Sequence, residues 1–203
     1  MRRILDVLVA AVGLVLTSPV LLAAAVAVRL DSPGPAIFRQ RRVGLGGESF
    51  DILKFRTMRE DAESLGAQLT IGADPRVTRV GKFLRAWKID ELPQLINVLR
   101  GEMALVGPRP EVPRYVDLYT PEQRQVLRAR PGITDPASIQ FRSESEFMAR
   151  QEDPERYYRE VLMPLKLQIN LDYLARRTLA SDFGILVETA KAVVTGRGAA
   201  EEP

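Results

Sequence analysis

The stretch ILDVLVAAVGLVLTSPVLLAAAVAV, which covers Ile4–Val28, decides the architecture that this sequence predicts. A helix that crosses a bilayer needs about 20 apolar residues, and this stretch is longer. A cleaved signal peptide is a competing interpretation, with Arg2 and Arg3 as its basic start and Ala23-Ala24-Ala25 as its cleavage site. However, the apolar part of a signal peptide usually has about 7–15 residues. We therefore expect a membrane segment that stays attached to the chain.

The pair Ser18-Pro19 interrupts this segment near its middle. Proline cannot donate a hydrogen bond to the carbonyl four residues earlier, here that of Val15, so a helix must bend at this point. A hydroxyl from Thr17 or Ser18 is able to satisfy the freed carbonyls. Basic residues favour the cytoplasmic side of a membrane, and they flank both ends of the segment: Arg2, Arg3, Arg29, Arg39, Arg41 and Arg42. We expect a kinked re-entrant helix over residues 1–30, with a single-pass helix as the open alternative.

The composition limits the chemistry that the chain can perform. Its 203 residues are enough for one domain with a core. The sequence contains no histidine and no cysteine, which excludes His-based catalytic triads, disulfides and thiolate metal sites. Acids, bases, nucleophiles and metal ligands must come mainly from carboxylates, hydroxyls, amides or lysine. Such oxygen ligands favour a hard cation such as Mg²⁺.

Residues 31–203 are predicted to form one domain of the α+β class, mostly helical. The turn-forming segment Asp31-Ser32-Pro33-Gly34-Pro35 marks the exit from the membrane. Two strand-like runs, Ala36–Val43 and Ser49–Phe55, flank a glycine-rich loop and predict a small β-hairpin. The basic residues of this hairpin predict either a solvated edge or an anion-binding surface.

Apolar periodicity predicts amphipathic helices in the remainder of the chain. The first carries an apolar face made of Val77, Val80, Phe83, Leu84 and Trp87. A second runs from Glu91 to about Arg100, and a short one is expected over Pro121–Arg130. The run Leu165–Tyr173 fits a strand or a helix. Ser181 is expected to cap a last helix that ends at Gly196 and either packs on the core or lies at the membrane interface.

Two adjacent carboxylates, Asp90 and Glu91, stand at the start of the second helix. Aspartate is a favoured N-cap that stabilises a helix by about 1 kcal/mol over alanine, and Pro93 is tolerated in a first turn. The same position also suits catalysis, because a helix start attracts phosphate and an aspartate facing a cation-bound phosphate can attack phosphorus. Neighbouring helical residues point about 100° apart, so different roles fit them better than a shared proton. Both interpretations stay open on these residues alone.

Arg109 lies between Pro108 and Pro110. One interpretation is a rigid loop whose arginine points to solvent. The other is that the prolines fix the backbone and hold the guanidinium ready to bind a phosphate whose charge changes during a reaction.

Several motifs in a fixed order resemble the bacterial sugar transferase family, the monotopic phosphoglycosyl transferases. The motifs are Ser18-Pro19 in an apolar start, Gln40-Arg41-Arg42-Val43-Gly44, Lys54-Phe55-Arg56-Thr57-Met58, Asp90-Glu91-Leu92-Pro93-Gln94, Gly107-Pro108-Arg109-Pro110 and Pro131-Gly132-Ile133-Thr134. Their order makes the signal more specific than any one of them, and the resemblance covers nearly the whole chain. The chain looks like the minimal catalytic form, since no large membrane domain precedes these motifs.

This resemblance implies an enzyme of the bacterial cytoplasmic (inner) membrane, with residues 31–203 as its catalytic domain on the cytoplasmic face. The enzyme would move a sugar 1-phosphate from a UDP-sugar to a polyprenol (undecaprenyl) phosphate and release UMP. That transfer would be the first membrane step of glycoconjugate synthesis, by a ping-pong mechanism through a phosphoglycosyl-aspartate. The resemblance implies Mg²⁺ as cofactor, the lipid bilayer as a partner and no nucleic acid.

The same resemblance assigns roles to single residues. Asp90 looks like the nucleophile, Glu91 looks like its metal-binding partner, and Ser18-Pro19 looks like the kink that returns the helix to the inner face. The substrate- and phosphate-binding residues would be Arg109, Arg85, Lys54 and Arg142.

Three positions depart from the family pattern. Lys88 stands where a small hydroxyl residue is usual, Ala104 replaces a frequent serine, and Asp135-Pro136-Ala137-Ser138 follows the Pro131–Thr134 motif. The last two changes put any inherited sugar specificity in doubt. The alternative from another class is a membrane-anchored, non-catalytic protein whose basic face binds anionic lipid or a partner. The Asp-x-Asp signature of phosphatases is absent from the sequence.

Overall fold

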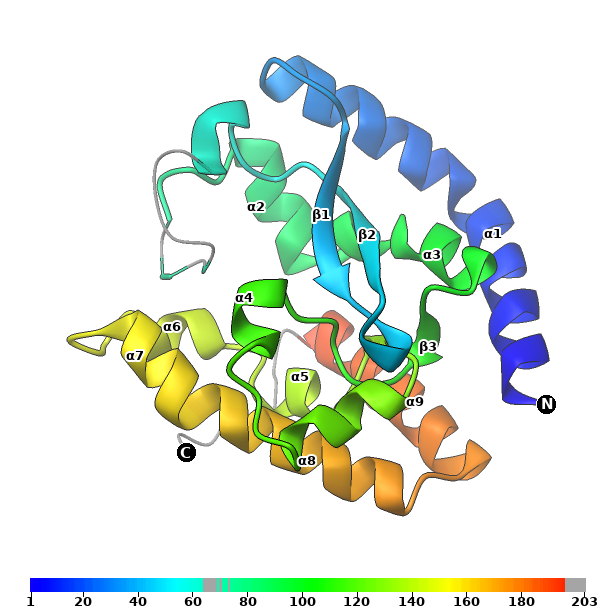
Figure 1. Cartoon of the computed structure of the whole chain (residues 1–203). Coiled ribbons are helices and arrows are strands. Elements are labelled where there is room, and N and C mark those ends of the chain that lie inside the picture. Colours follow the sequence, from blue (N-terminus) through cyan, green and yellow to red (C-terminus); the bar gives the residue numbers. More distant parts are fainter. Residues whose placement is uncertain (64–68, 70, 73, 196–203) are drawn as a thin grey trace.

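The apolar N-terminal stretch forms one continuous helix, α1 (Arg2–Asp31), in the computed structural model of this chain (Figure 1). The structure describes residues 1–63, 69, 71–72 and 74–195. Helix α1 is long and apolar enough to cross a membrane, by length and composition. Large apolar side chains project from it into solvent; Val15 and Leu16, for example, are each 73% exposed. An exposed apolar surface of this extent marks a contact with another apolar phase.

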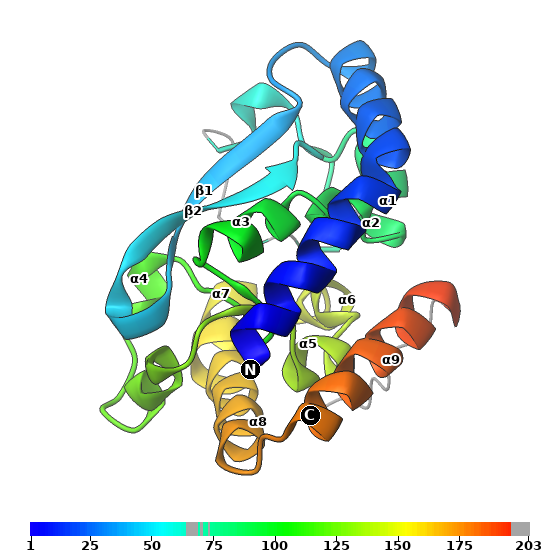
Figure 2. The same cartoon turned by 90° about the vertical axis from the view of Figure 1, so that its right-hand side faces the viewer.

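Pro19 lies inside α1, and the helix axis changes direction along its length in Figures 1 and 2. The hydroxyl of Ser18 donates to the carbonyl of Val15 at 2.8 Å, and that of Thr17 donates to the carbonyl of Gly13 at 2.7 Å. Because proline has no N–H, Pro19 cannot donate a hydrogen bond to the carbonyl of Val15. The prediction that a hydroxyl satisfies the freed carbonyl is therefore confirmed, with Ser18 in that role.

The predicted hairpin is confirmed, with β1 (Ile37–Val43) antiparallel to β2 (Ser49–Phe55). Its register pairs Ile37 with Phe55 and Val43 with Ser49. The connecting 3₁₀ turn, η1 (Leu45–Gly47), contains two glycines with positive φ, at 69° and 87°. Glycine adopts that conformation without steric cost, which explains the glycine-rich loop.

A short helical segment follows the hairpin and carries the paired carboxylates. It consists of α2 (Arg79–Ala86), the 3₁₀ turn η3 (Ile89–Glu91) and α3 (Gln94–Arg100). The predicted single helix Glu91–Arg100 is therefore wrong at its start, because a turn precedes α3. Leu84 of α2 is buried against α1, whereas Phe83 and Trp87 are exposed. The apolar face predicted for this helix is thus only partly used in the core.

Two motifs meet at a small parallel sheet made of β3 (Ala104–Val106) and β4 (Gly132–Thr134). A Cβ on Gly132 would lie 2.1 Å from the backbone nitrogen of Gly107, so the two backbones touch. Only glycine permits this approach. The loop that carries Arg109 is thereby fixed against the Pro131–Thr134 motif.

The second half of the described chain is helical and packs around an apolar cluster that includes Tyr115, Phe141, Met148 and Leu162. Its helical elements are α4 (Pro113–Val116), η4 (Gln123–Arg128), α5 (Pro136–Gln140), α6 (Glu144–Met148), α7 (Pro154–Tyr157), the π-helical turn η5 (Tyr158–Leu162), α8 (Met163–Ala175) and α9 (Leu179–Thr195). The 3₁₀ turn η2 (Glu60–Glu63) lies earlier in the chain, between β2 and α2. In Figure 2, α1 lies in front, and α8 and α9 lie below it, with α8 to the left of α9. The fold is α+β and mostly helical, as predicted.

Three local predictions need correction or completion. Leu165–Tyr173 is helical, so the strand alternative is wrong. The helix expected over Pro121–Arg130 is shorter and of the 3₁₀ type. Helix α9 begins two residues before Ser181, whose backbone N–H bonds the hydroxyl of Thr178 at 3.0 Å, so Ser181 is not its cap. The predicted end of this helix at Gly196 lies outside the described residues.

Candidate functional site

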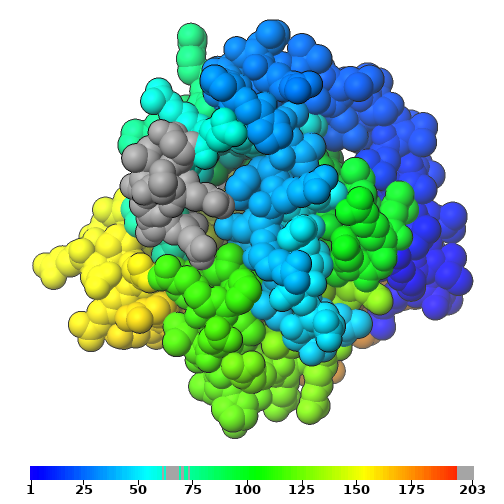
Figure 3. Space-filling view, turned by 45° about the horizontal axis from the view of Figure 1, so that its top comes forward, coloured from blue at the N-terminus to red at the C-terminus, as the bar shows by residue number. Residues whose placement is uncertain are grey.

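A cavity of about 1230 Å³ brings the predicted site residues together. All six of the predicted catalytic and phosphate-binding residues line it: Lys54, Arg85, Asp90, Glu91, Arg109 and Arg142. Ala25 and Arg29 of α1 also line it, so the cavity reaches the apolar helix. Ser18 and Pro19 lie elsewhere on α1. Figure 3 shows the hairpin, in light blue, lying between α1 and the green segment that contains α4 and η4.

The turn that holds the carboxylates is created by Lys88. Its φ of 56° makes it the only non-glycine residue with positive φ in the described chain, a conformation that L-residues rarely adopt. This left-handed residue ends α2 and starts η3, which turns Asp90 and Glu91 inward; each is only 7% exposed. Lys88, one of the departures from the family pattern, therefore has a structural role.

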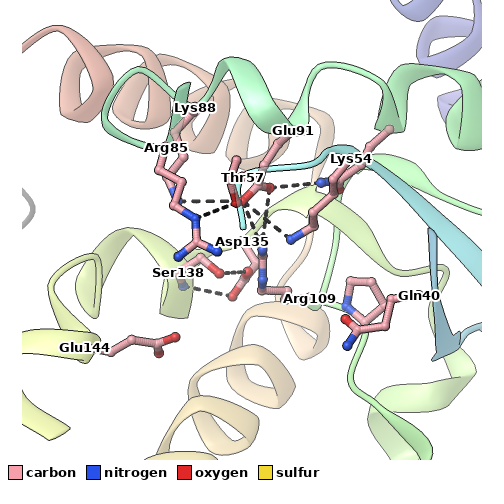
Figure 4. A network of polar contacts seen from close by, with 12 residues as sticks. Gln40, Lys54, Thr57, Arg85, Lys88, Glu91, Arg109, Asp135, Ser138 and Glu144 are labelled. Atoms are coloured by element: carbon pink, nitrogen blue, oxygen red, sulfur yellow. Dashed lines mark hydrogen bonds and ion pairs between the residues drawn. The ribbon is translucent and has the colours of Figure 1, made fainter. Parts of the chain in front are cut away.

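Three cationic side chains contact the carboxylate of Glu91. Arg109 holds it with two parallel hydrogen bonds, Nη2 to Oε1 at 2.9 Å and Nη1 to Oε2 at 3.1 Å (Figure 4). The Nζ atoms of Lys88 and Lys54 lie 3.7 Å and 4.0 Å from Oε1. Burial alone would raise the pKa of Glu91, but the charges of Arg109, Lys54 and Lys88 outweigh it and hold that pKa well below its ordinary value. Glu91 is therefore ionised at neutral pH.

Asp90 has the opposite environment. Its Oδ1 atom is buried and has no hydrogen-bond partner among the described residues. Neither η3 nor α3 has a side-chain cap, and the residue preceding α3 is Pro93, so the interpretation of Asp90 as an N-cap is wrong. Burial, and next the charge of Glu91, raise the pKa of Asp90. The prediction that the two neighbours have different roles agrees with these environments.

Arg85 adds a fourth cation to the three that contact Glu91. Burial, and next the charge of Arg109, lower the pKa of Lys54 to about 7. Arg85 donates from Nε to the hydroxyl of Thr57 at 2.8 Å. The charge of Glu91 raises the pKa of Arg109. The two hydrogen bonds from Arg109 to Glu91 exclude the interpretation that this arginine simply points to solvent. Counting Lys88, four cationic side chains face two carboxylates here, and such an excess suits an anionic ligand.

Arg142 lines the same cavity, further from the carboxylates. Its Nη2 lies 3.3 Å from the carbonyl of Ala86. The neighbouring departure from the family pattern, Asp135–Ser138, is structural. Asp135 accepts the backbone N–H of Ser138 at 3.1 Å as the cap of α5, and it also accepts the amide of Asn170 at 3.0 Å.

Sequence reasoning missed two buried amides that fix the pair. Gln94 donates to Oε2 of Glu91 at 3.1 Å. Asn97 accepts the N–H of Leu53 at 3.0 Å and donates to the carbonyl of Asp51 at 2.8 Å, which ties α3 to the strand that carries Lys54. Both amide side chains are fully buried. The signal that could have identified these amides in the sequence is a polar residue on the apolar, inward-facing side of a helix.

The donor set can be tested for a divalent cation. Within the described residues there is no group of three acidic side chains that could hold a metal. Mg²⁺, however, usually takes one or two carboxylates together with substrate phosphates and water. Asp90 offers an unpartnered carboxylate oxygen and Glu91 stands beside it. The residues present therefore fit a magnesium ion that arrives with a phosphate-bearing ligand.

Comparisons with known proteins agree with this arrangement. The family model described as Bacterial sugar transferase matches residues 1–196. The chain is 45% identical over 200 residues to the UDP-glucose:undecaprenyl-phosphate glucose-1-phosphate transferase of Caulobacter vibrioides, covering 96% of this chain and 70% of that protein. It is 39% identical over 203 residues to the UDP-N-acetylgalactosamine-undecaprenyl-phosphate N-acetylgalactosaminephosphotransferase of Aeromonas hydrophila, covering 98% of this chain and 44% of that protein. The exopolysaccharide production protein ExoY of Rhizobium meliloti is 34% identical, with 97% and 87% covered.

Proposed function

This chain belongs to the bacterial sugar transferase family, and from that premise we propose that it transfers a sugar 1-phosphate from a UDP-sugar to undecaprenyl phosphate and releases UMP. Named relatives use UDP-glucose or UDP-N-acetylgalactosamine. The reaction is the first membrane step in the synthesis of a bacterial glycoconjugate.

The unpartnered Oδ1 atom of Asp90 carries this proposal. A buried polar atom without a hydrogen bond costs free energy, so in a native structure it calls for an explanation such as a catalytic role. Asp90 stands beside four cationic side chains that suit a diphosphate, and residues of the apolar helix α1 also line the cavity. That combination matches a reaction between a water-soluble phosphate donor and a lipid-borne phosphate acceptor.

In the first step Asp90 is the nucleophile. A carboxylate oxygen of Asp90 attacks the β-phosphorus of the UDP-sugar, forming an acyl phosphate, while the bond from that phosphorus to the bridging oxygen breaks and UMP leaves with the electron pair. Arg109, Arg85 and Lys54 bind the diphosphate and stabilise the charge that develops on it. The raised pKa of Asp90 reflects a carboxylate that is weakly solvated.

In the second step a phosphate oxygen of undecaprenyl phosphate attacks the same phosphorus. The bond between Asp90 and phosphorus breaks, the lipid-linked sugar diphosphate leaves, and the carboxylate is restored. The two substrates bind in turn, so a single phosphate pocket serves both of them. Glu91 remains ionised throughout and keeps Arg109 oriented.

Mg²⁺ is the cofactor of the proposed reaction. Glu91 and the diphosphate oxygens would hold it. When bound, the ion would neutralise the charge that develops on the leaving phosphate.

The position of α1 supports a re-entrant helix at the cytoplasmic face of the inner membrane. In its first turn Arg3 donates to carbonyls of α3, and in its last turn Asp31 accepts the N–H of Val80 at 3.0 Å. Both ends bind the same folded domain, which supports the proposal that both lie on one side of the bilayer. Basic residues at both ends favour the cytoplasmic side. The exposed side chains of Phe83, Trp87 and Phe183 extend the apolar surface beyond α1.

The test is a survey of UDP-sugars. Purified protein in lipid nanodiscs that contain undecaprenyl phosphate and Mg²⁺ should release UMP from at least one UDP-hexose, and the lipid should gain the sugar phosphate. Absence of UMP with every UDP-sugar, from a folded and membrane-bound preparation, would contradict the proposal. Cysteines introduced at positions 2 and 31 should be labelled from the same side of sealed vesicles, and labelling from opposite sides would establish a spanning helix.

A further inference from the structure

The first turn of α1 binds the C-terminal end of α3, the helix that follows Asp90 and Glu91. Arg3 donates from Nη1 to the carbonyl of Val98 at 2.6 Å and from Nη2 to the carbonyl of Leu99 at 3.1 Å. Its guanidinium also lies over Gly101, the left-handed residue that ends α3. The carbonyls at a helix C-terminus lack intrahelical partners and carry partial negative charge, so a guanidinium is a well-matched partner for them.

The same turn also contacts the strand that leads to Arg109. A carboxylate oxygen of Asp6 accepts the N–H of Leu105, in β3, at 3.4 Å. Four residues later the chain reaches Arg109, which holds Glu91. The N-terminal turn of the membrane helix therefore contacts both of the elements, α3 and β3, that converge on the carboxylate pair.

The catalytic turn needs such support. Lys88 occupies a left-handed conformation and Asp90 is buried without a hydrogen bond for Oδ1, and unfavourable local states persist only when the surrounding structure fixes them. From η3 to Gly101 the chain is almost continuously helical. A displacement at Val98 is therefore transmitted to Asp90 by a short and stiff segment.

We propose that Arg3 is a positioning residue, which sets the place of Asp90 by anchoring the C-terminal end of α3 to the membrane helix. This inference rests on the proposed function. It gives the basic start of α1 a role beyond attraction to lipid headgroups. The seating of α1 in the bilayer is thereby coupled to the geometry of the catalytic turn.

Arg2 provides a matched control, since it is a neighbouring arginine at the same end of α1. It donates from Nε to Asp182 at 3.1 Å and from Nη2 to the carbonyl of Arg177 at 3.0 Å, at the junction of α8 and α9. Arg2→Gln and Arg3→Gln remove the same charge from the same membrane flank. They differ in whether α3 loses its anchor.

The experiment compares steady-state UMP release by both variants in nanodiscs. Because a misplacement of about 1 Å can cost about 10²-fold in rate, we expect Arg3→Gln to lower kcat about tenfold while KM for the UDP-sugar changes less than about twofold. Arg2→Gln should change neither value more than about twofold. Arg3→Lys, which keeps the charge and donates to one carbonyl at a time, should recover part of kcat.

Equal kcat values for Arg2→Gln and Arg3→Gln would overturn the inference, and so would a loss explained by less membrane-bound protein. Amide hydrogen exchange adds a readout that needs no turnover. Arg3→Gln should speed exchange over residues 89–100 more than Arg2→Gln does, and identical exchange would also overturn the inference. If the wild-type protein turns over no UDP-sugar, the proposed function fails, whereas the exchange comparison still tests the anchor.

Discussion

The two ends of α3 differ in how well their polar groups are satisfied. At the C-terminal end Gly101 adopts a left-handed conformation, Arg3 holds the carbonyls of Val98 and Leu99, and Arg130 holds that of Gly101 at 2.7 Å. At the N-terminal end a lysine occupies the left-handed region and Asp90 has an unpartnered oxygen. Helix ends are normally stabilised by caps. The end without one is the end that we assign to chemistry.

This contrast is consistent with the proposed nucleophile in a domain without histidine. Glu91 is surrounded by cations and stays ionised, and its charge helps to raise the pKa of its neighbour. In our proposal Glu91 binds the cations, Asp90 stays available to react, and the anchored C-terminal end of α3 holds the turn that carries both.

The largest expected effect comes from Asp90→Asn, which replaces the proposed nucleophile at the N-terminal end of α3 with an amide. We expect turnover to fall by at least about 10³-fold, since an amide is a poor nucleophile. Burial raises the folded-state pKa of Asp90, so the wild-type protein loses stability as pH rises through that pKa and the group ionises. The variant should therefore be at least as stable as the wild type at pH 7. UMP release and thermal unfolding measure both effects, with the exposed Asp117→Asn as the control; robust UMP release by Asp90→Asn would remove Asp90 from its role.

Arg109→Ala tests the pairing of Arg109 with Glu91, the carboxylate that binds the cations. Removing the two bonds to Glu91 leaves a buried charge that only Lys54 and Lys88 balance, so we expect a loss of about 2–3 kcal/mol in unfolding free energy and a large rise in KM for the UDP-sugar. The double variant Arg109→Ala/Glu91→Gln should recover most of the stability but none of the activity. Unaltered kinetics in Arg109→Ala would exclude Arg109 from phosphate binding.

Asn97→Ala tests a buried residue of α3 to which we assign a structural role and no catalytic one. Its amide links α3 to β2 through the backbone of Leu53 and Asp51, and its loss leaves the buried N–H of Leu53 unpaired. We expect a loss of about 2 kcal/mol in unfolding free energy, measured by urea denaturation. A KM for the UDP-sugar that stays within about twofold at a temperature where the variant is folded would agree with a structural role, and unchanged stability would contradict it.

Lys54→Arg gives the smallest expected effect, which appears only as a pH dependence. Burial and the charge of Arg109 lower the pKa of Lys54 to about 7, so this side chain is charged below that pH and neutral above it. In the wild type, kcat/KM for the UDP-sugar should fall as pH rises through about 7. Arginine stays charged, so the variant should lack this fall. Identical pH profiles would contradict a phosphate-binding role for Lys54.

Much of the fold was predictable because its signals are local. The apolar run of α1, the alternation in the hairpin and the glycine-rich turn each specify their own element. The choice between strand and helix for Leu165–Tyr173 was open because its apolar residues fit both periods. Packing of α8 against α5 and η4 accompanies the helical form. Ser181 was misplaced as a cap because Thr178 lies only three residues earlier and serves instead.

The site was predictable in its membership but not in its geometry. Motifs identified the acids and bases that line the cavity, yet no local signal shows that Lys88 would take a left-handed conformation, because glycine or asparagine usually marks such a turn. Likewise, the anchors of α3 come from residues far away in the chain, such as Arg3 and Leu53. Contacts of that kind follow from the tertiary structure alone.

The most direct test of the central claim is mass spectrometry of the protein after reaction with a UDP-sugar that supports UMP release, with no undecaprenyl phosphate present. Trypsin should yield the peptide Ile89–Arg100, which contains Asp90. We predict that this peptide gains the mass of one phosphosugar group and that added undecaprenyl phosphate removes it. An unmodified peptide, together with kinetics in which both substrates must be bound before UMP is released, would contradict a covalent aspartyl intermediate.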